Sequence, residues 1–144
     1  DRIIFEPSRH CGDFSGLAHL GAAGNTVYHC VHEITCRSSS CDRFTDVAKL
    51  SMLHELAHPW LASNLDSRRR DAFLDLAEPL SWLDESVTWD RRGVEWAAEI
   101  LAWGLLDRPM ELLRLRFPSC ALRISTFRAL TDADPMNRCN TGSS

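Results

Sequence analysis

Two histidines and a glutamate occur together in the segment His54-Glu55-Leu56-Ala57-His58. On a helix, residues four apart face the same way, so both imidazoles can reach one zinc ion at about 2.0–2.1 Å. Glu55 lies one residue further round, beside the metal and not on it, where a general base takes a proton from a water molecule. The spacing predicts a zinc site with His54 and His58 as ligands and Glu55 as the catalytic base.

A catalytic zinc ion needs a third protein ligand. Leu61 and Asn64 stand where an extended HExxHxxGxxH motif would place Gly and His, so the ligand must come from another segment. Glu95 and Glu99 lie four apart in the apolar segment 94–102, where a buried carboxylate is costly unless a positive group meets it. A zinc ion bound by one, with a ligand histidine held by the other, satisfies both carboxylates. The alternative is that both face solvent on an amphipathic helix.

Taken together, HELAH and the later segment RGVEWAAEILAWGL resemble a small gluzincin, a class of zinc metallopeptidase with two helix histidines and a downstream glutamate. The pattern from Glu95 to Glu99 is similar to the second zinc helix of lethal-factor-type toxin proteases and of ImmA/IrrE-type regulatory proteases. The chain also resembles uncharacterised actinobacterial HExxH proteins. The resemblance covers residues 45–106. It implies that Glu95 is the third zinc ligand and that Glu99 holds the far ring nitrogen of a zinc histidine.

Zinc peptidases commonly add a Tyr or His donor that stabilises the oxyanion of the tetrahedral intermediate. Tyr28 is the only tyrosine, and it lies with His32 in a segment of mixed polarity that we interpret as a partly exposed or edge strand. One of these two side chains is a candidate donor, with ordinary strand packing as the alternative for each. An extended peptide substrate is expected to pair with this strand.

Pro59 follows the second histidine directly. A proline inside a helix removes one N–H and clashes with the carbonyl four residues back, here that of Glu55, at a cost of about 3 kcal/mol. We therefore expect a kink or an early helix end after His58, with the spacing of the histidines preserved. Trp60 comes next and is a candidate wall of the site, whereas the tryptophans in general are expected to pack in the core.

The elements that must position these residues follow from periodicity and turn signals. The predicted strands are a short one at the RIIF segment, ending at Pro7, and a hairpin of residues 16–21 and 25–34. The predicted helices run from about residue 45 through the histidines, from 66 or 67 to 78, from 92 to 106, and over 109–117 and 119–131. This order indicates an α+β fold, a mainly helical, minimal zincin-like domain with a small N-terminal β-sheet.

Length and charge narrow the classes of protein. The chain has 144 residues, which suits a single domain over 1–139 with a flexible tail at 140–144. The net charge is −4, and the basic run 68–70 is flanked by acidic residues, so we expect no nucleic-acid partner. No run of about 18 apolar residues occurs, which predicts no membrane span.

The six cysteines are an even number without a CxxC pair, which favours a secreted, disulfide-stabilised domain. No signal peptide is visible, so a secreted form is expected to be a mature chain. We expect Cys120 to pair with Cys139 and the other four cysteines to pair among themselves. The alternative is a second metal site between Cys30 and Cys41.

The sequence thus predicts a zinc-dependent peptidase acting on a peptide or protein substrate. Two other classes remain open. One is a non-catalytic, zinc-stabilised secreted binding or effector module, favoured by the proline and by the uncertain oxyanion donor. The other is a disulfide-rich structural protein in which HExxH is a coincidence.

Overall fold

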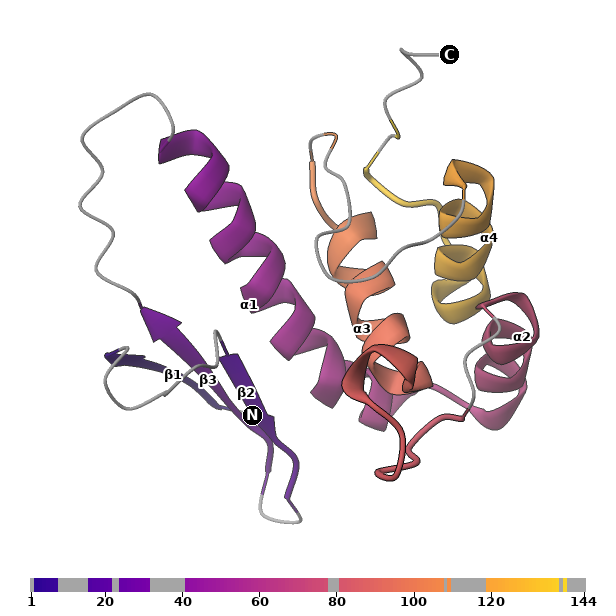
Figure 1. Ribbon diagram of the computed structural model, residues 1–144, viewed down its shortest axis with the longest axis horizontal. Coiled ribbons are helices and arrows are strands. Elements are labelled where there is room, and N and C mark those ends of the chain that lie inside the picture. Colours follow the sequence, from indigo (N-terminus) through magenta and orange to yellow (C-terminus); the bar gives the residue numbers. More distant parts are fainter. Residues whose placement is uncertain are drawn as a thin grey trace.

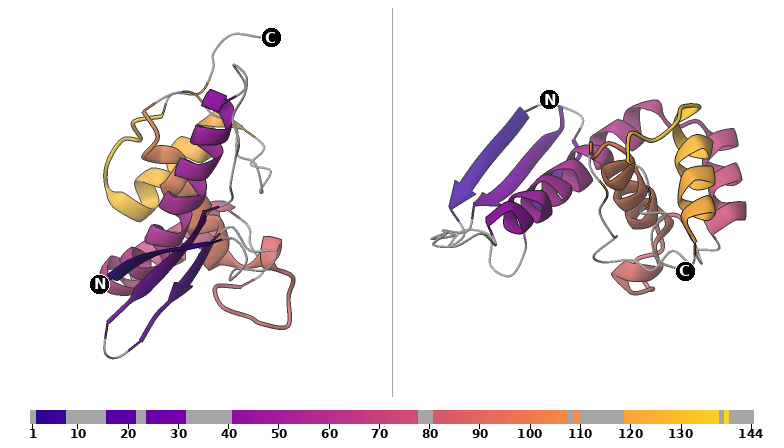
Figure 2. Two further views of the ribbon diagram at one scale, coloured as in Figure 1. Left: turned by 90° about the vertical axis from the view of Figure 1, so that its left-hand side faces the viewer. Right: turned by 90° about the horizontal axis from the view of Figure 1, so that it is seen from above.

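The computed structural model describes residues 2–7, 16–21, 24–31, 41–77, 81–107, 109, 119–137 and 139. In chain order their elements are β1 (Arg2–Pro7), β2 (Gly16–His19), β3 (Thr26–Val31), α1 (Cys41–Asn64), α2 (Ser67–Ala77), the short 3₁₀-helix η2 (Trp89–Arg91), α3 (Gly93–Gly104) and α4 (Cys120–Thr131). The fold of this part of the chain is α+β and mainly helical, which confirms the predicted class. Helix α1 lies between the sheet on one side and α3, α4 and α2 on the other (Figures 1 and 2). None of the helices described is both long and apolar enough to cross a membrane.

The three strands form one mixed sheet in the order β1-β3-β2. Strands β2 and β3 make the predicted antiparallel hairpin, in which Leu17 lies opposite Tyr28. Strand β1 ends at Pro7 as predicted and pairs with β3 in parallel, with Ile4 opposite Tyr28 on the other side. The prediction that β3 is an edge strand is therefore wrong. When only one face of a central strand packs on a helix, the strand shows the same mixed pattern of polar and apolar residues as an edge strand.

Helix α1 contains Pro59 and continues beyond it to Asn64, so of the two outcomes expected after His58 the early helix end is wrong, and the kink stays a prediction. Figure 1 shows α1 as one continuous helix. Ala57 and Leu61, on either side of the proline, are 5% and 3% exposed and belong to the main core. Burial of these side chains offsets the roughly 3 kcal/mol that a proline costs inside a helix.

Helices α2 and α4 each begin at a polar side chain that accepts a hydrogen bond from the first turn of the helix. The Asp66 carboxylate accepts a hydrogen bond from the backbone N–H of Arg69 at 2.8 Å, ahead of α2. The Ser119 hydroxyl accepts one from the N–H of Leu122 at 3.1 Å, ahead of α4. The helices predicted over 66–78, 92–106 and 119–131 are confirmed to within a few residues, α1 begins earlier than predicted, and residues 110–117 lie outside the described chain.

The main core lies where α3 meets the other helices. Ala97 and Ala98 of α3 are 0% exposed, and their small side chains let neighbouring helices approach closely. The fully or nearly buried members of this core are Ala57, Leu61, Phe73, Ala77, Ala97, Ala98, Ile100, Leu101, Phe127 and Leu130. Close packing of α3 against α1 fixes the separation of the two helices that carry the predicted site residues.

A disulfide joins Cys120, at the start of α4, to Cys139, which confirms that prediction. It closes a loop with a sequence separation of 19, for which the chain-entropy model gives about 3 kcal/mol of stabilisation. The predicted pairing of the other four cysteines, and the alternative metal site between Cys30 and Cys41, involve side chains outside the described part of the structure.

Replacing Gly104 by alanine is expected to destabilise the fold by about 1–3 kcal/mol. A Cβ atom added at Gly104 would lie 2.1 Å from the ring of Phe127, so this ring, or the helix α4 that carries it, would have to shift. Glycine-to-alanine changes inside helices usually stabilise by up to about 1 kcal/mol, so the sign is diagnostic. Urea unfolding measures the change, and a Gly104→Ala variant as stable as the parent would contradict the close contact.

Candidate metal centre

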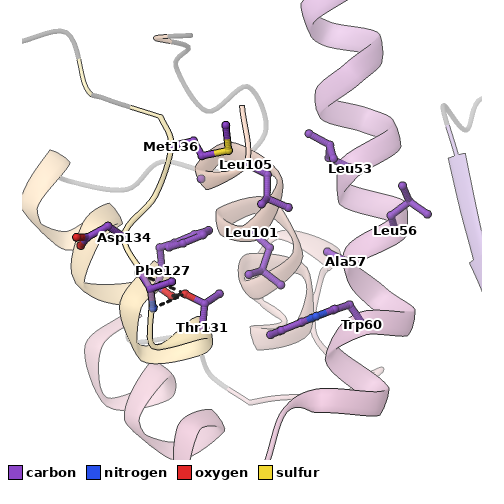
Figure 3. A pocket seen from close by; sticks show the side chains of 12 residues that line it. Leu53, Leu56, Ala57, Trp60, Leu101, Leu105, Phe127, Thr131, Asp134 and Met136 are labelled. Atoms are coloured by element: carbon purple, nitrogen blue, oxygen red, sulfur yellow. Dashed lines mark hydrogen bonds between the residues drawn. The ribbon is translucent and has the colours of Figure 1, made fainter. Parts of the chain in front are cut away.

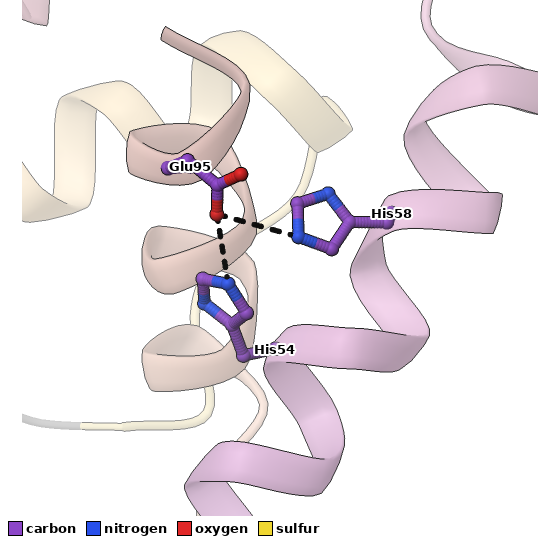
Figure 4. Close-up of side chains that lie close together, drawn as sticks. All are labelled: His54, His58 and Glu95. Atoms are coloured by element: carbon purple, nitrogen blue, oxygen red, sulfur yellow. Dashed lines mark hydrogen bonds and ion pairs between the residues drawn. The ribbon is translucent and has the colours of Figure 1, made fainter. Parts of the chain in front are cut away.

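The side chains of His54, His58 and Glu95 converge between α1 and α3 (Figure 4). Oε2 of Glu95 lies 3.2 Å from Nε2 of His54 and 3.4 Å from Nε2 of His58. The two histidines are one turn apart on α1, and Glu95 is in the first turn of α3. The His54 side chain is 2% exposed, whereas those of His58 and Glu95 are each 13% exposed. Solvent therefore reaches the cluster on the side of His58 and Glu95.

These three residues fit a zinc ion. A tetrahedral zinc with bonds of about 2.0–2.1 Å holds neighbouring ligand atoms roughly 3.3–3.4 Å apart. The two nitrogen–oxygen separations match that edge length, and all three ligand atoms lie within 4.8 Å of one another. Two imidazoles and one carboxylate are also the donor set of catalytic zinc sites that leave a fourth position for water.

Glu99 contacts His54 from the side away from Glu95. It is 0% exposed, and its Oε2 accepts a hydrogen bond from Nδ1 of His54 at 2.9 Å. Its Oε1 has no hydrogen-bond partner among the described residues, so the bond to His54 is what compensates this buried carboxylate. With the proton held on Nδ1, the Nε2 lone pair of a neutral His54 is directed towards Glu95 and is available to a metal.

Glu55 lies near the cluster without joining it. It is 7% exposed, and its carboxylate is one of the charges that raise the pKa of His54. It is not one of the residues whose ligand atoms converge. A carboxylate beside a metal position, rather than on it, is where a general base is needed.

The cluster shifts the pKa values of its own members. Burial disfavours the charged form of His54, but the hydrogen bonds to Glu95 and Glu99 outweigh burial and raise the pKa of His54 to about 9. Burial also opposes ionisation of Glu95, and the hydrogen bonds to His54 and His58 overcome it, lowering the pKa of Glu95 to about 2. Glu95 is therefore an anion at neutral pH, as a zinc ligand must be.

The metal-free protein is expected to lose stability as the pH rises from about 6 to about 10. The pKa of His54 is about 9 in the folded chain and 6.5 without its partners. Its contribution is fully present below pH 6.5 and is lost as the pH rises through about 9, to an extent of about 3 kcal/mol. Urea unfolding of chelator-treated protein across this range measures the loss. The control variant His19→Ala removes an exposed histidine and should show the same pH dependence of stability as the parent. If His54→Ala also keeps this pH dependence, His54 is not its source.

Glu99→Gln is expected to weaken zinc binding by about 10–100-fold. A glutamine can still accept the Nδ1–H bond but carries no charge to strengthen the imidazole as a ligand. Competition against a chromophoric chelator measures the affinity. Asp75→Asn removes an exposed carboxylate from α2 and is the matched control. Equal zinc affinity in Glu99→Gln and Asp75→Asn would show that Glu99 does not support the metal ligand.

Trp89 is a residue of this region that the sequence interpretation missed. Its ring centroid lies 5.8 Å from that of His54, with the two rings tilted by 32°. The signal in the sequence was its position in the loop that leads directly into the helix of Glu95, whereas the predicted wall of the site was Trp60, which follows the histidines. The spacing of residues along a helix does not predict which side chains of a neighbouring loop contact that helix.

Trp60 lines a different space. It borders an apolar cavity of about 410 Å³ between α1, α3 and α4, together with Leu53, Ala57, Leu101 and Phe127 (Figure 3). None of the zinc-site residues lines this cavity. At 100° per residue, Trp60 and His58 point to different faces of α1. The structure therefore does not bring Trp60 to the predicted site.

The two candidate oxyanion donors are not brought to the cluster in the described part of the chain. Val27 is 2% exposed and lies with Leu56 and Trp60 in a pocket between β3 and α1. Because neighbouring strand residues alternate, Tyr28 points to the face of β3 away from α1. His32 lies outside the described residues.

Comparison with known proteins gives no assignment: no family model, curated protein or solved structure matches this chain.

Proposed function

We propose that this chain is a zinc-dependent peptidase. The observation that carries the proposal is the convergence of His54, His58 and Glu95 at separations of 3.2 and 3.4 Å, which suit the edges of a zinc tetrahedron. The bond of Glu99 to His54 adds support, because a metal-binding histidine commonly donates its other ring N–H to a carboxylate.

When bound, zinc supplies a Lewis acid that lowers the pKa of its water to about 7. Glu55 would accept a proton from the attacking water and return it to the leaving amine. Glu99 keeps the Nδ1 proton on His54, so that this imidazole stays neutral and correctly oriented. The walls of the cluster limit access by bulk water, because His54 and Glu55 are 1% and 7% exposed.

The substrate class is a peptide in extended conformation. Strand β3 is flanked on both sides, so it cannot take the substrate strand that the sequence interpretation assigned to it. Strand β2 packs on α1, and no described strand covers its outer edge. Backbone hydrogen bonding to such an edge binds a peptide with little dependence on its sequence. The Cys120–Cys139 disulfide is compatible with an extracellular setting, which we include in the proposal.

Chelation tests the proposal. A fluorogenic peptide library should be cleaved by the zinc-loaded protein, left intact after treatment with a chelator, and cleaved again when zinc is added back. Cleavage that is indifferent to chelation would assign the activity to a contaminant or to other residues. No cleavage by protein shown to hold one zinc per chain would exclude the peptidase.

The second candidate is a zinc-stabilised binding module without turnover. It is favoured by the position of Tyr28, the only tyrosine of the chain, which lies on the face of β3 away from α1. Glu55→Gln separates the two functions: it stops a peptidase and leaves the partner binding of a module unchanged.

A further inference from the structure

The turn before α3 holds a large aromatic ring against the candidate metal centre. Trp89 lies 5.8 Å from His54 between ring centroids, yet Trp89 is 36% exposed and His54 is 1% exposed. Trp89 therefore covers a buried member of the cluster with part of its ring and leaves the rest open to solvent. An exposed indole beside a reactive centre offers apolar contact area at a low cost in side-chain entropy.

The core does not require Trp89. Trp82 and Trp96 pack against the main core, and Trp103 is 0% exposed, whereas Trp89 belongs to neither of the two described core clusters. Packing therefore accounts for these other tryptophans of the region but leaves the open part of Trp89 unexplained.

The loop that carries Trp89 is fixed at both ends. The backbone N–H of Gly93 donates to the carbonyl of Ser81 at 2.7 Å, which closes the loop at its base. A Cβ atom at Gly93 would lie 3.1 Å from the same carbonyl oxygen and 2.9 Å from Leu74, so a glycine suits this close approach. Within the loop, the Arg92 guanidinium donates to the carbonyl oxygens of Val87 and Glu85 at 3.2 and 3.3 Å.

A further bond ties η2 itself to α3. The indole N–H of Trp96, one turn into α3, donates to the carbonyl of Asp90 at 2.6 Å. Trp89 is therefore held in a preorganised position relative to Glu95, which lies on α3 next to Trp96. Preorganisation reduces the entropy lost when a ligand binds.

We propose that the open face of Trp89 forms a subsite for a large apolar or aromatic substrate side chain adjoining the bond that is cut; this rests on the proposed function. The residues next to Trp89 in the turn, Asp90 and Arg91, are both exposed and carry opposite charges. They give the subsite no net charge that would select a charged side chain. An apolar side chain gains by burying the exposed part of the indole.

The test uses four probes that need no turnover: the N-acetyl hydroxamates of phenylalanine, leucine, arginine and glycine. A hydroxamate chelates zinc, so each probe brings its side chain beside the metal centre. Zinc-loaded parent protein should bind the phenylalanine and leucine probes roughly tenfold more tightly than the glycine probe. Trp89→Ala should reduce this ratio to about twofold or less, and Trp89→Phe should keep most of it.

Trp60→Ala is the matched control, because Trp60 is also 36% exposed but lies on a different face of α1 from His58. It should leave the ratio unchanged. An unchanged ratio in Trp89→Ala overturns the subsite, and so does a parent protein that does not discriminate or that prefers the arginine probe. Zinc content is measured for every variant.

Failure of the subsite can be told from failure of the peptidase. Peptide cleavage without any preference among the probes overturns the role of Trp89 alone. Probe preference without cleavage overturns the peptidase and leaves Trp89 as a recognition residue of a zinc-binding module. A protein that holds no zinc and binds none of the four probes overturns both.

Discussion

Replacing Glu55 by glutamine is expected to lower kcat for peptide hydrolysis by roughly 10²–10⁴-fold while zinc stays bound. The amide has nearly the shape of the carboxylate but cannot take a proton from the attacking water. Because Glu55 is not one of the residues whose ligand atoms converge, its replacement leaves His54, His58 and Glu95 in place. Initial rates with a fluorogenic peptide and the zinc content of the same sample measure the two effects together.

Glu85→Gln is the matched control for this variant, since it removes an exposed carboxylate from the loop before η2. It should keep the activity of the parent. If Glu55→Gln loses its zinc together with its activity, Glu55 supports the metal site and is not the base. If Glu55→Gln keeps full activity, another group accepts the proton and the mechanism given for this chain is wrong.

Replacing His54 by alanine is expected to abolish tight zinc binding and to destabilise the metal-free fold by about 3–5 kcal/mol. The metal-free cost arises at Glu99, which is 0% exposed and has His54 as its hydrogen-bond partner. Without the imidazole this carboxylate is a buried charge with no compensation. Urea unfolding of chelator-treated samples gives the free energy, and isothermal titration with zinc gives the affinity.

His58→Ala is the control that separates the two effects. It removes a zinc ligand but leaves the bond between His54 and Glu99 intact, and the His58 side chain is 13% exposed. It should therefore bind zinc as poorly as His54→Ala while costing the metal-free fold much less. The double variant His54→Ala with Glu99→Leu should recover much of the lost stability, since no buried charge remains. Equal stability of His54→Ala and the parent would contradict the burial argument and favour a coincidental HExxH.

Local signals predicted most of the helices. Asp66 and Ser119 cap α2 and α4 through bonds to their own first turns, and such bonds depend only on neighbours in sequence. The hairpin of β2 and β3 was likewise predictable, because a short connection joins two alternating segments.

Contacts between distant segments were not predictable from local pattern. The parallel pairing of β1 with β3 makes β3 the central strand of the sheet. The sequence around Tyr28 contains no signal that predicts pairing with β1. The helix beyond Pro59 survives because Ala57 and Leu61 are buried against other helices, a tertiary contribution that outweighs the local cost of proline.

In the candidate site, too, some features were predictable from local sequence and others depend on contacts between distant segments. His54 and His58 share a face by helical spacing, and the burial of Glu95 and Glu99 between apolar neighbours indicated that they needed a positive partner. The structure brings Glu95 and Glu99 to opposite sides of the His54 ring. The contact of Trp89 with His54 was not predicted. It depends on the hydrogen bond between Ser81 and Gly93 that closes the loop, and residue spacing does not predict this bond.

The proposed peptidase depends on one zinc ion held by His54, His58 and Glu95. The most direct measurement is a crystal of zinc-reconstituted protein with diffraction recorded on both sides of the zinc absorption edge. We expect a single anomalous peak per chain, about 2.0–2.1 Å from Nε2 of each histidine and from a carboxylate oxygen of Glu95. A map with no peak among these three side chains, or with the peak at other residues, would contradict it.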